Sequence, residues 1–256
     1  RSRRSELPQA PRPLRGAPRN RERGTGGVIR SFLGTSLIEY PGRISSVVFF
    51  GGCNLYCPFC HNPELVKPDI LAGQYTLDED AVVRMLSERH GFVDGVCITG
   101  GEPLLSPSLP GFLRRIRSEA GLAVKLDTNG TLPDRLSEVM DLVDYVAMDL
   151  KAAPEAYGKA TGGKASFEDV LRSIELVRSI PDYEFRTTLV PGIVSAGDLP
   201  GLLERTGRVR RYVLQRFRPG KTLSPDYSGI TPYPPGYVEQ AADRVRHLAD
   251  EVLVRS

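Results

Sequence analysis

Short apolar runs alternate with helical patterns of hydrophobic residues from Ile44 onwards. Six of these runs have strand length and are rich in β-branched and aromatic residues, which favours strands. Parallel strands need long crossover connections, and helices usually supply them. The pattern therefore predicts six strand–helix units around a parallel sheet. The predicted strands are Ile44–Phe50, Gly95–Thr99, Leu122–Leu126, Tyr145–Leu150, Phe185–Val190 and Tyr212–Phe217.

The number of units, compared with the chain length, predicts an incomplete barrel. A closed barrel of eight strand–helix units usually needs about 250 residues. This chain has 256 residues but only six predicted units. We therefore expect an α/β fold of the partial (β/α)6 barrel type, with a parallel sheet that is open on one side. The last predicted helix runs from Tyr237 to about Val252.

The first 27 residues differ from the rest in composition. Nine of the 34 Lys and Arg residues but only two of the 31 Asp and Glu residues lie within positions 1–30, which leaves 25 basic against 29 acidic side chains. Positions 1–27 are rich in arginine and proline and lack apolar periodicity, which predicts a disordered tail before one barrel domain at 28–256. A basic tail or an organelle transit peptide is the alternative. The mildly acidic remainder gives no support to nucleic-acid binding.

Cysteine provides the clearest chemical signal in the sequence. Three of the four cysteines, Cys53, Cys57 and Cys60, have the spacing C-x3-C-x2-C. Such a loop can close on zinc or on an iron–sulfur cluster, and either centre normally takes four protein ligands. Three cysteines would leave one iron of a four-iron cluster open to a small molecule. This clustering predicts a metal site in a reducing cytoplasm rather than a disulfide framework. No run approaches eighteen apolar residues, so we expect no membrane span.

Polar residues also follow the later predicted strands. Parallel barrels gather such groups at one face, where the strands end. The expected site therefore faces the cysteine loop. The residues of this expected site are Gly100, Gly101 and Glu102 after one strand, Asp127, Thr128 and Asn129 after the next, and Asp149 and Lys151 after the following one. For the second of these three segments, the alternative is an ordinary Asn-Gly turn, and for the third it is a salt bridge at the rim of the barrel.

The cysteine spacing, with Phe59 just before the last cysteine, resembles the signature of the radical S-adenosylmethionine (radical SAM) superfamily. The wider context, at positions 36–42 and 50–65, resembles the activating proteins of glycyl radical enzymes. The similarity is greatest to those of anaerobic ribonucleoside-triphosphate reductase. It extends from about Gly34 to the C-terminus.

This resemblance implies that Cys53, Cys57 and Cys60 hold a [4Fe–4S] cluster whose open iron binds S-adenosylmethionine (SAM). Reductive cleavage of SAM would then produce a radical that takes hydrogen from a glycine of the partner enzyme. A flavodoxin- or ferredoxin-type protein would supply the electron. The residues implied in SAM binding are Phe59, Gly100, Gly101, Glu102, Asp127, Thr128, Asn129, Asp149 and Lys151.

Two other functions remain open. One is a radical SAM enzyme that acts on a small molecule and resembles the 7-carboxy-7-deazaguanine synthases. The other is a non-catalytic zinc or iron–sulfur module. Glu102 and its neighbouring glycines argue against such a module, because a metal carrier needs no amino-acid pocket. Cys97 lies inside an apolar run, where a thiol behaves as a small hydrophobic group.

Overall fold

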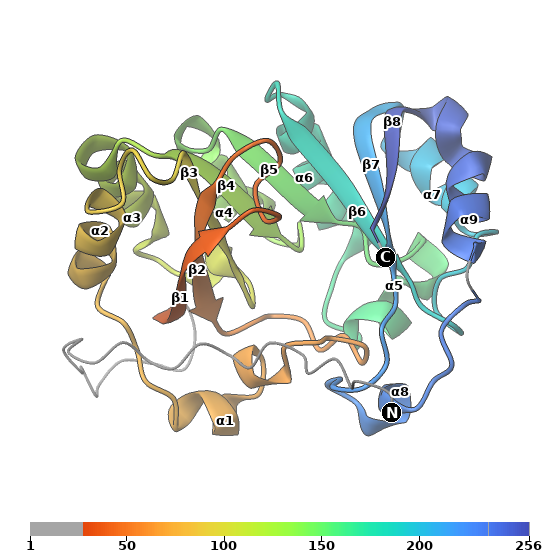
Figure 1. The fold of residues 1–256 in the computed structure, drawn as a ribbon. Helices are drawn as coiled ribbons and strands as arrows, with labels where there is room; N and C mark the ends of the chain where they lie inside the picture. The colour runs from red at the N-terminus through yellow and green to blue at the C-terminus, as the bar shows by residue number, and fades with distance from the viewer. Residues whose placement is uncertain (1–27, 235, 256) are drawn as a thin grey trace, which may run out of the picture.

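A computed structural model describes residues 28–234 and 236–255, so the tail predicted at positions 1–27 lies outside the described residues. Eight strands form one sheet in sequence order (Figure 1). The first pair is antiparallel and all later pairs are parallel. The two edge strands are not paired with each other, so the sheet is an open barrel. The strands are β1 Val28–Ser36, β2 Ser45–Gly51, β3 Gly95–Gly100, β4 Ala123–Thr128, β5 Tyr145–Asp149, β6 Tyr183–Leu189, β7 Val209–Arg216 and β8 Ala249–Arg255.

Helices cover the outer face of this sheet (Figure 1). Neighbouring helices pack in pairs, with α2 on α3, α4 on α6 and α7 on α9. Two short helices, α1 and α8, lie beyond the ends of the strands (Figure 1). The α-helices are α1 Pro68–Ala72, α2 Glu79–Ser87, α3 Leu109–Arg115, α4 Pro133–Ser137, α5 Pro154–Thr161, α6 Phe167–Arg178, α7 Leu199–Thr206, α8 Pro225–Ser228 and α9 Tyr237–Val245. Further helical turns are η1 Pro63–Leu65, η2 Pro103–Leu105, η3 Ile116–Ala120, η4 Met140–Leu142 and η5 Arg246–Leu248.

The open α/β barrel predicted from the sequence is confirmed, and its six predicted strands correspond to β2–β7. The sheet is wider than predicted by one strand at each edge. The helix predicted to reach Val252 ends at Val245, and a turn then leads into β8. β1 was not predicted either, because only Ile29 and Ser36 of its nine residues are buried and the strand shows no regular alternation. None of the helices within the described ranges is long and apolar enough to cross a membrane.

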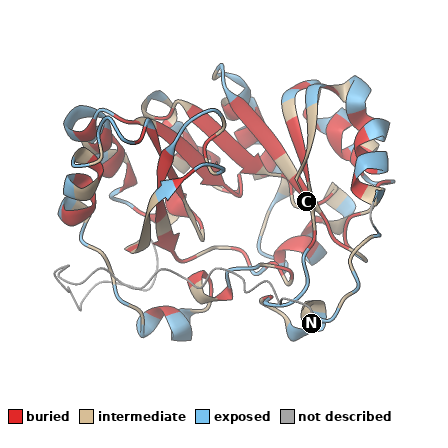
Figure 2. Cartoon of the chain, viewed as in Figure 1, coloured by how far each residue is buried: buried red, intermediate tan, exposed pale blue. Residues whose placement is uncertain are grey.

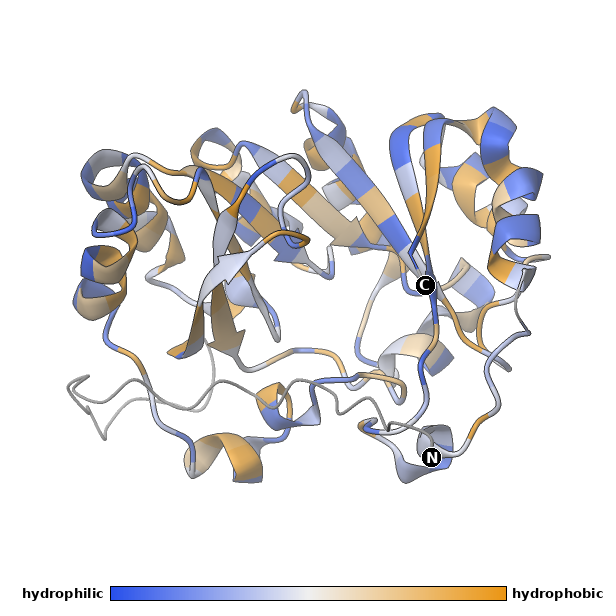
Figure 3. Cartoon of the chain, viewed as in Figure 1, coloured by the Kyte–Doolittle hydropathy of each residue, from blue (hydrophilic) through white to orange (hydrophobic). Residues whose placement is uncertain are grey.

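The two faces of the sheet differ in character. Outward side chains such as Val124 and Leu126 of β4 belong to the main core beneath the helices. Between them, Lys125 and Asp127 pair with each other on the inner face. Figure 2 shows that strands β2–β6 are largely buried, and Figure 3 shows polar and apolar positions interleaved along β6–β8. The inner face is therefore charged although it is largely shielded from solvent.

A set of ionic hydrogen bonds ties the edge strand β8 to the middle of the sheet. Both terminal nitrogens of Arg255 donate to the carboxylate of Glu184 on β6, each at 2.9 Å. The hydroxyl of Tyr145 donates to the same carboxylate at 2.9 Å, and Arg211 donates to that hydroxyl at 3.0 Å. Because Glu184 is 0% exposed, these donors replace the water that its charge has lost.

We expect Arg255→Met to lower the free energy of unfolding by about 1–3 kcal/mol, because it removes the bidentate partner of a buried carboxylate. Chemical denaturation measures this loss. The matched control is Arg208→Met, which breaks a pair with Asp250 whose side chains are 63% and 59% exposed. That change should cost no more than about 0.5 kcal/mol. Equal losses in the two variants would contradict the role given to Glu184.

Candidate functional site

The cysteine loop follows β2 and is fixed by backbone hydrogen bonds to three distant segments. The N–H of Gly52 donates to the Leu65 carbonyl at 2.8 Å. On the side of α5, the Tyr56 N–H donates to the Thr161 carbonyl at 3.1 Å. The segment after β7 supplies two more donors, the N–H groups of residues 223 and 224, to the carbonyls of residues 60 and 58 at 3.0 and 2.9 Å. The loop therefore has a fixed shape set by the surrounding fold.

Of the three cysteines of this loop, Cys57 is buried, and Cys53 and Cys60 are half-buried. Burial raises the pKa of Cys53 to about 12 and that of Cys57 to about 11, and it also raises the pKa of Cys60. The positive charge of Lys151 acts in the opposite direction on all three thiols. A bound metal would add the positive charge that buried thiolates need.

Another group of potential metal ligands lies close together on the inner face. Among the described residues, Glu39, Cys97 and Asp127 each offer one ligand atom, and these three atoms lie within 4.8 Å of one another. No cysteine of the loop belongs to this group.

The paired glycines after β3 allow the backbone to pass very close to the cysteine loop. Gly100 has a φ of 125°, in the left-handed region. A Cβ atom on Gly100 would collide with the carbonyl of Phe50, and one on Gly101 with the carbonyl of Gly52. Hydrogen bonds of 2.8 Å from the N–H groups of Gly101 and Glu102 to these same carbonyls close the contact. The structure therefore gives these glycines a packing role, in addition to the ligand role implied by the resemblance.

Glu102 is fully buried, and its carboxylate joins the exits of β3 and β4. It accepts hydrogen bonds from the N–H of Leu104 at 3.1 Å, the N–H of Asn129 at 2.7 Å and the hydroxyl of Thr128 at 3.0 Å. Burial raises the pKa of Glu102 to about 7, whereas these three donors lower it. Thr128 and Glu102, both predicted site residues, are thus in direct contact.

Asn129 reaches the cysteine loop itself. Its side-chain amide donates to Asn54 Oδ1 at 2.9 Å and lies 3.9 Å from the sulfur of Cys53. Asn54 in turn donates to the hydroxyl of Thr131 at 2.7 Å. The sequence did not identify Asn54 or Thr131 as members of the site. The only sequence feature that could have identified them is their position, since Asn54 directly follows Cys53 and Thr131 lies two residues after Asn129.

The remaining predicted polar residues form a chain of alternating charge on the inner face. Arg186 of β6 donates to Asp127 at 3.3 Å and to Asp149 at 2.8 Å. Lys151 donates to Asp149 at 2.7 Å. Burial would raise the pKa of Asp149, but Arg186 and Lys151 together hold it below its ordinary value. Asp149, the last residue of β5, and Lys151, two residues beyond it, therefore form the salt bridge considered as an alternative. Arg186 joins them without having been predicted.

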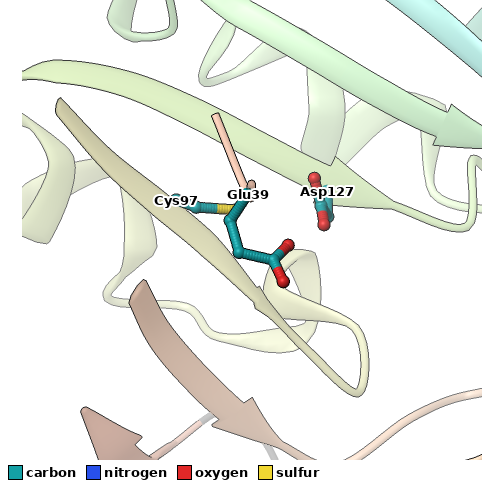
Figure 4. Close-up of side chains that lie close together, drawn as sticks. All are labelled: Glu39, Cys97 and Asp127. Atoms are coloured by element: carbon teal, nitrogen blue, oxygen red, sulfur yellow. The ribbon is translucent and has the colours of Figure 1, made fainter. Parts of the chain in front are cut away.

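Asp127 lies close to Cys97 and Glu39 (Figure 4), with one potential ligand atom of each within 4.8 Å of the other two. Lys125, 1% exposed, forms an ion pair with Asp127, and its ammonium lies 3.6 Å from the Cys97 sulfur. The Lys125 ammonium therefore places a positive charge next to both the Asp127 carboxylate and the Cys97 thiol. Cys97 is 0% exposed within β3, and burial raises its pKa. Its thiol lies beside Lys125, Asp127 and Glu39, whereas its two neighbours in the sequence belong to the main core, so the expected purely hydrophobic role does not describe its surroundings.

Aromatic residues complete the surroundings of the cysteine loop. Phe59 is buried within the main core. The exposed ring of His61 lies 5.9 Å from that of Phe217. Tyr157 of α5 is 2% exposed, and its hydroxyl has no hydrogen-bond partner. Tyr157 was missed because α5 itself was not predicted.

Comparison with known families decides the assignment. Residues 47–196, more than half of the chain, match the Radical SAM superfamily. This chain belongs to the radical SAM superfamily. Members of the superfamily use a [4Fe–4S] cluster and SAM. Three soft thiol ligands on one short loop and the nearby positive charge of Lys151 fit such a cluster, which Cys53, Cys57 and Cys60 would hold.

Two similar proteins are assigned as activating enzymes. A Methanocaldococcus jannaschii protein, provisionally named a glycyl-radical enzyme activating enzyme, is 27% identical over 239 residues, which cover 90% of this chain and 96% of the relative. The pyruvate formate-lyase-activating enzyme of Clostridium pasteurianum is 33% identical over 155 residues, covering 58% of this chain and 63% of that enzyme. The relatives of this chain thus include proteins that are named as activating enzymes of glycyl radical enzymes or of pyruvate formate-lyase.

Other relatives share the fold or only part of the chain. The 7-carboxy-7-deazaguanine synthase of Methanothermobacter thermautotrophicus is 34% identical over 129 residues, covering 49% of this chain and 48% of the synthase. The crystal structure of Streptococcus suis SuiB superposes with a TM-score of 0.59 at 14% identity, covering 80% of this chain and 47% of SuiB. This chain thus spans about half the length of each of these two proteins.

Gly101→Ala should lower the free energy of unfolding by at least about 2 kcal/mol and reduce the iron bound after reconstitution, because the new Cβ meets the Gly52 carbonyl. Gly111→Ala in α3 is the control, since its Cβ would meet nothing within 4 Å. An alanine there should be neutral or stabilise the helix by up to about 1 kcal/mol. Denaturation and iron analysis measure both effects. Full iron binding by the Gly101 variant would contradict the proposed contact.

Cys57→Ala should abolish stable iron binding, because two thiolates cannot retain a four-iron cluster. Cys97→Ala should retain the wild-type iron and sulfide content, because Cys97 faces Lys125 and not the loop. Iron and sulfide analysis after anaerobic reconstitution compares the two variants. The reverse result, with iron lost only from the Cys97 variant, would overturn the ligand assignment.

Proposed function

We propose that this radical SAM enzyme activates a glycyl radical enzyme, with anaerobic ribonucleoside-triphosphate reductase as its partner. The observation that carries this proposal is the extent of the similarity to the Methanocaldococcus protein, which covers 90% of this chain and 96% of that relative. Similarity to the deazaguanine synthase covers only half of the chain. The open sheet, with β1 and β8 unpaired to each other, also suits a loop of a protein substrate.

In this function, the bound cluster and SAM would supply a 5′-deoxyadenosyl radical, and the chain would position them. Cys53, Cys57 and Cys60 would hold the cluster from a loop fixed on three sides. The backbone at Gly100 and Gly101 would face the amino group of SAM. Glu102 would hold that segment against Asn129, whose amide reaches Cys53.

The inner charges would serve the same site. Asp149 and Lys151 lie at the end of β5 and are oriented by Arg186, so that their charges stay fixed before a ligand enters. Asp127, Thr128 and Phe59 complete the proposed SAM-binding set. Preorganised charges of this kind avoid the reorganisation that flexible groups would require.

We also propose a flavodoxin- or ferredoxin-type protein as the electron donor and the cytoplasm as the compartment. All four cysteines are free thiols, which suits a reducing compartment.

The test follows deuterium from the partner into 5′-deoxyadenosine. The reconstituted enzyme is mixed with SAM, a one-electron reductant and the reductase, whose glycines carry deuterium at the α-carbon. We expect an organic radical in the electron paramagnetic resonance (EPR) spectrum and deuterium in the nucleoside. The Cys57→Ala protein is the control and should give neither. Unlabelled nucleoside from the reductase, together with label from a deuterated pterin-like substrate, would support the synthase alternative instead.

A further inference from the structure

Three side chains beside the first cysteine of the loop form a closed ring of hydrogen bonds. Asn129 Nδ2 donates to Asn54 Oδ1 at 2.9 Å, and Asn54 Nδ2 donates to the hydroxyl of Thr131 at 2.7 Å. That hydroxyl donates to Asn129 Oδ1 at 2.6 Å, which closes the ring. Asn54 belongs to the cysteine loop, whereas Asn129 and Thr131 follow β4. The ring therefore joins two segments that are distant in sequence.

One backbone group fixes the orientation of the Asn129 amide within this ring. The N–H of Thr131 donates to Asn129 Oδ1 at 3.0 Å, and a backbone N–H can only donate. A flipped amide would set its NH2 group against this N–H, so that two donors would face each other. The oxygen of Asn129 therefore faces Thr131, and its NH2 group faces the cysteine loop. Because the Thr131 hydroxyl donates to the same oxygen, its lone pairs are left to accept from Asn54.

The NH2 group held in this way is directed at sulfur. Asn129 Nδ2 lies 3.9 Å from Cys53 Sγ, within hydrogen-bonding distance for a sulfur acceptor. An NH2 group has two hydrogens, and Asn54 Oδ1 accepts only one of them. Asn129 is 6% and Thr131 7% exposed, so little water competes for the other hydrogen. The N–H of Leu55, within the loop itself, also donates to this sulfur, at 3.4 Å.

We propose that the Asn129 amide donates a hydrogen bond to the Cys53 sulfur and raises the reduction potential of the cluster that this sulfur would hold. Asn54 and Thr131 are the positioning residues that keep the amide in this orientation. The role is separate from the SAM contact that the resemblance implies for Asn129. It rests on Cys53 being a cluster ligand, and it is independent of which partner enzyme or substrate the protein acts on.

The direction of the effect follows from charge. Reduction adds one electron, which an external one-electron reductant supplies, and no covalent bond forms or breaks. The reduced cluster carries more negative charge on its sulfurs, so an N–H donor stabilises the reduced form more than the oxidised form. Hydrogen bonds to the sulfurs are among the factors that set the potentials of such clusters.

The first test is a redox titration of reconstituted Asn129→Leu without SAM or partner, with the reduced cluster followed by its EPR signal. Leucine has nearly the size of asparagine but has no N–H donor. If the lost bond changes the equilibrium constant of reduction about tenfold, the midpoint potential falls by about 59 mV for one electron. An unchanged potential would overturn the proposal. Because SAM and partner are absent, this result does not depend on the proposed activase function.

Substitutions at Thr131 test the positioning role, and they decide the question if Asn129→Leu binds no cluster. Thr131→Val removes the hydroxyl that holds both asparagines, and it should lower the same equilibrium constant about threefold. Thr131→Ser keeps the hydroxyl and should restore the wild-type potential. The wild-type potential in the valine variant, or equal falls in the valine and serine variants, would overturn the positioning role.

Thr206→Val is the matched control for loss of a buried hydroxyl. Thr206 is 2% exposed and its hydroxyl donates to the Leu203 carbonyl at 2.9 Å, but it lies on α7, which packs on α9. This variant should keep the wild-type potential even if its melting temperature falls. A fall in potential equal to that of Thr131→Val would overturn the proposal, because it would follow from stability alone. Iron analysis of Cys57→Ala tests the ligand assignment separately.

Discussion

The carboxyl ends of β2 and β3 lie so close together that no side chain fits between them. Gly100 and Gly101 meet the carbonyls of Phe50 and Gly52, and the N–H groups on one side bond to the carbonyls on the other. This contact fixes where the cysteine loop leaves the sheet. It also places Glu102 beneath the loop, where it can bind the exit of β4. The positions of the thiols and of the polar site therefore depend on one backbone-to-backbone contact, which only glycine permits.

A second constraint is electrostatic. Asp127, Arg186, Asp149 and Lys151 alternate in sign along the inner face, and each is held by the next. Each carboxylate of this chain has two cationic partners, Arg186 and Lys151 for Asp149 and Arg186 and Lys125 for Asp127, so that loss of Arg186 would leave each carboxylate with one partner. Lys151 ends this chain and acts on the loop thiols. The inner network thus connects the middle of the sheet to the charge of the cysteine loop.

The sequence predicted the parts of this molecule that depend on local pattern. The central strands follow β-branched runs, and the cysteine loop follows from spacing alone. β8 was missed because Val252 fits two patterns, the helical spacing that continues from Val245 and the alternation with Val254 that the strand uses. Arg186 and Asn54 join the site through contacts between segments that are distant in sequence, and no local pattern predicts such contacts.

The motif and the structure give Glu102 two different roles. The resemblance assigns its carboxylate to the amino group of SAM. In the structure, its oxygens already accept from two backbone N–H groups and a hydroxyl, all buried. Its bond to the Asn129 N–H fixes the residue whose side chain reaches Asn54 and Cys53. Glu102 would therefore act on a ligand at the loop indirectly, by positioning Asn129 and the glycine backbone, as well as through any direct contact. Burial, which raises the pKa of Glu102 to about 7, makes this link sensitive to the protonation of a single carboxyl group.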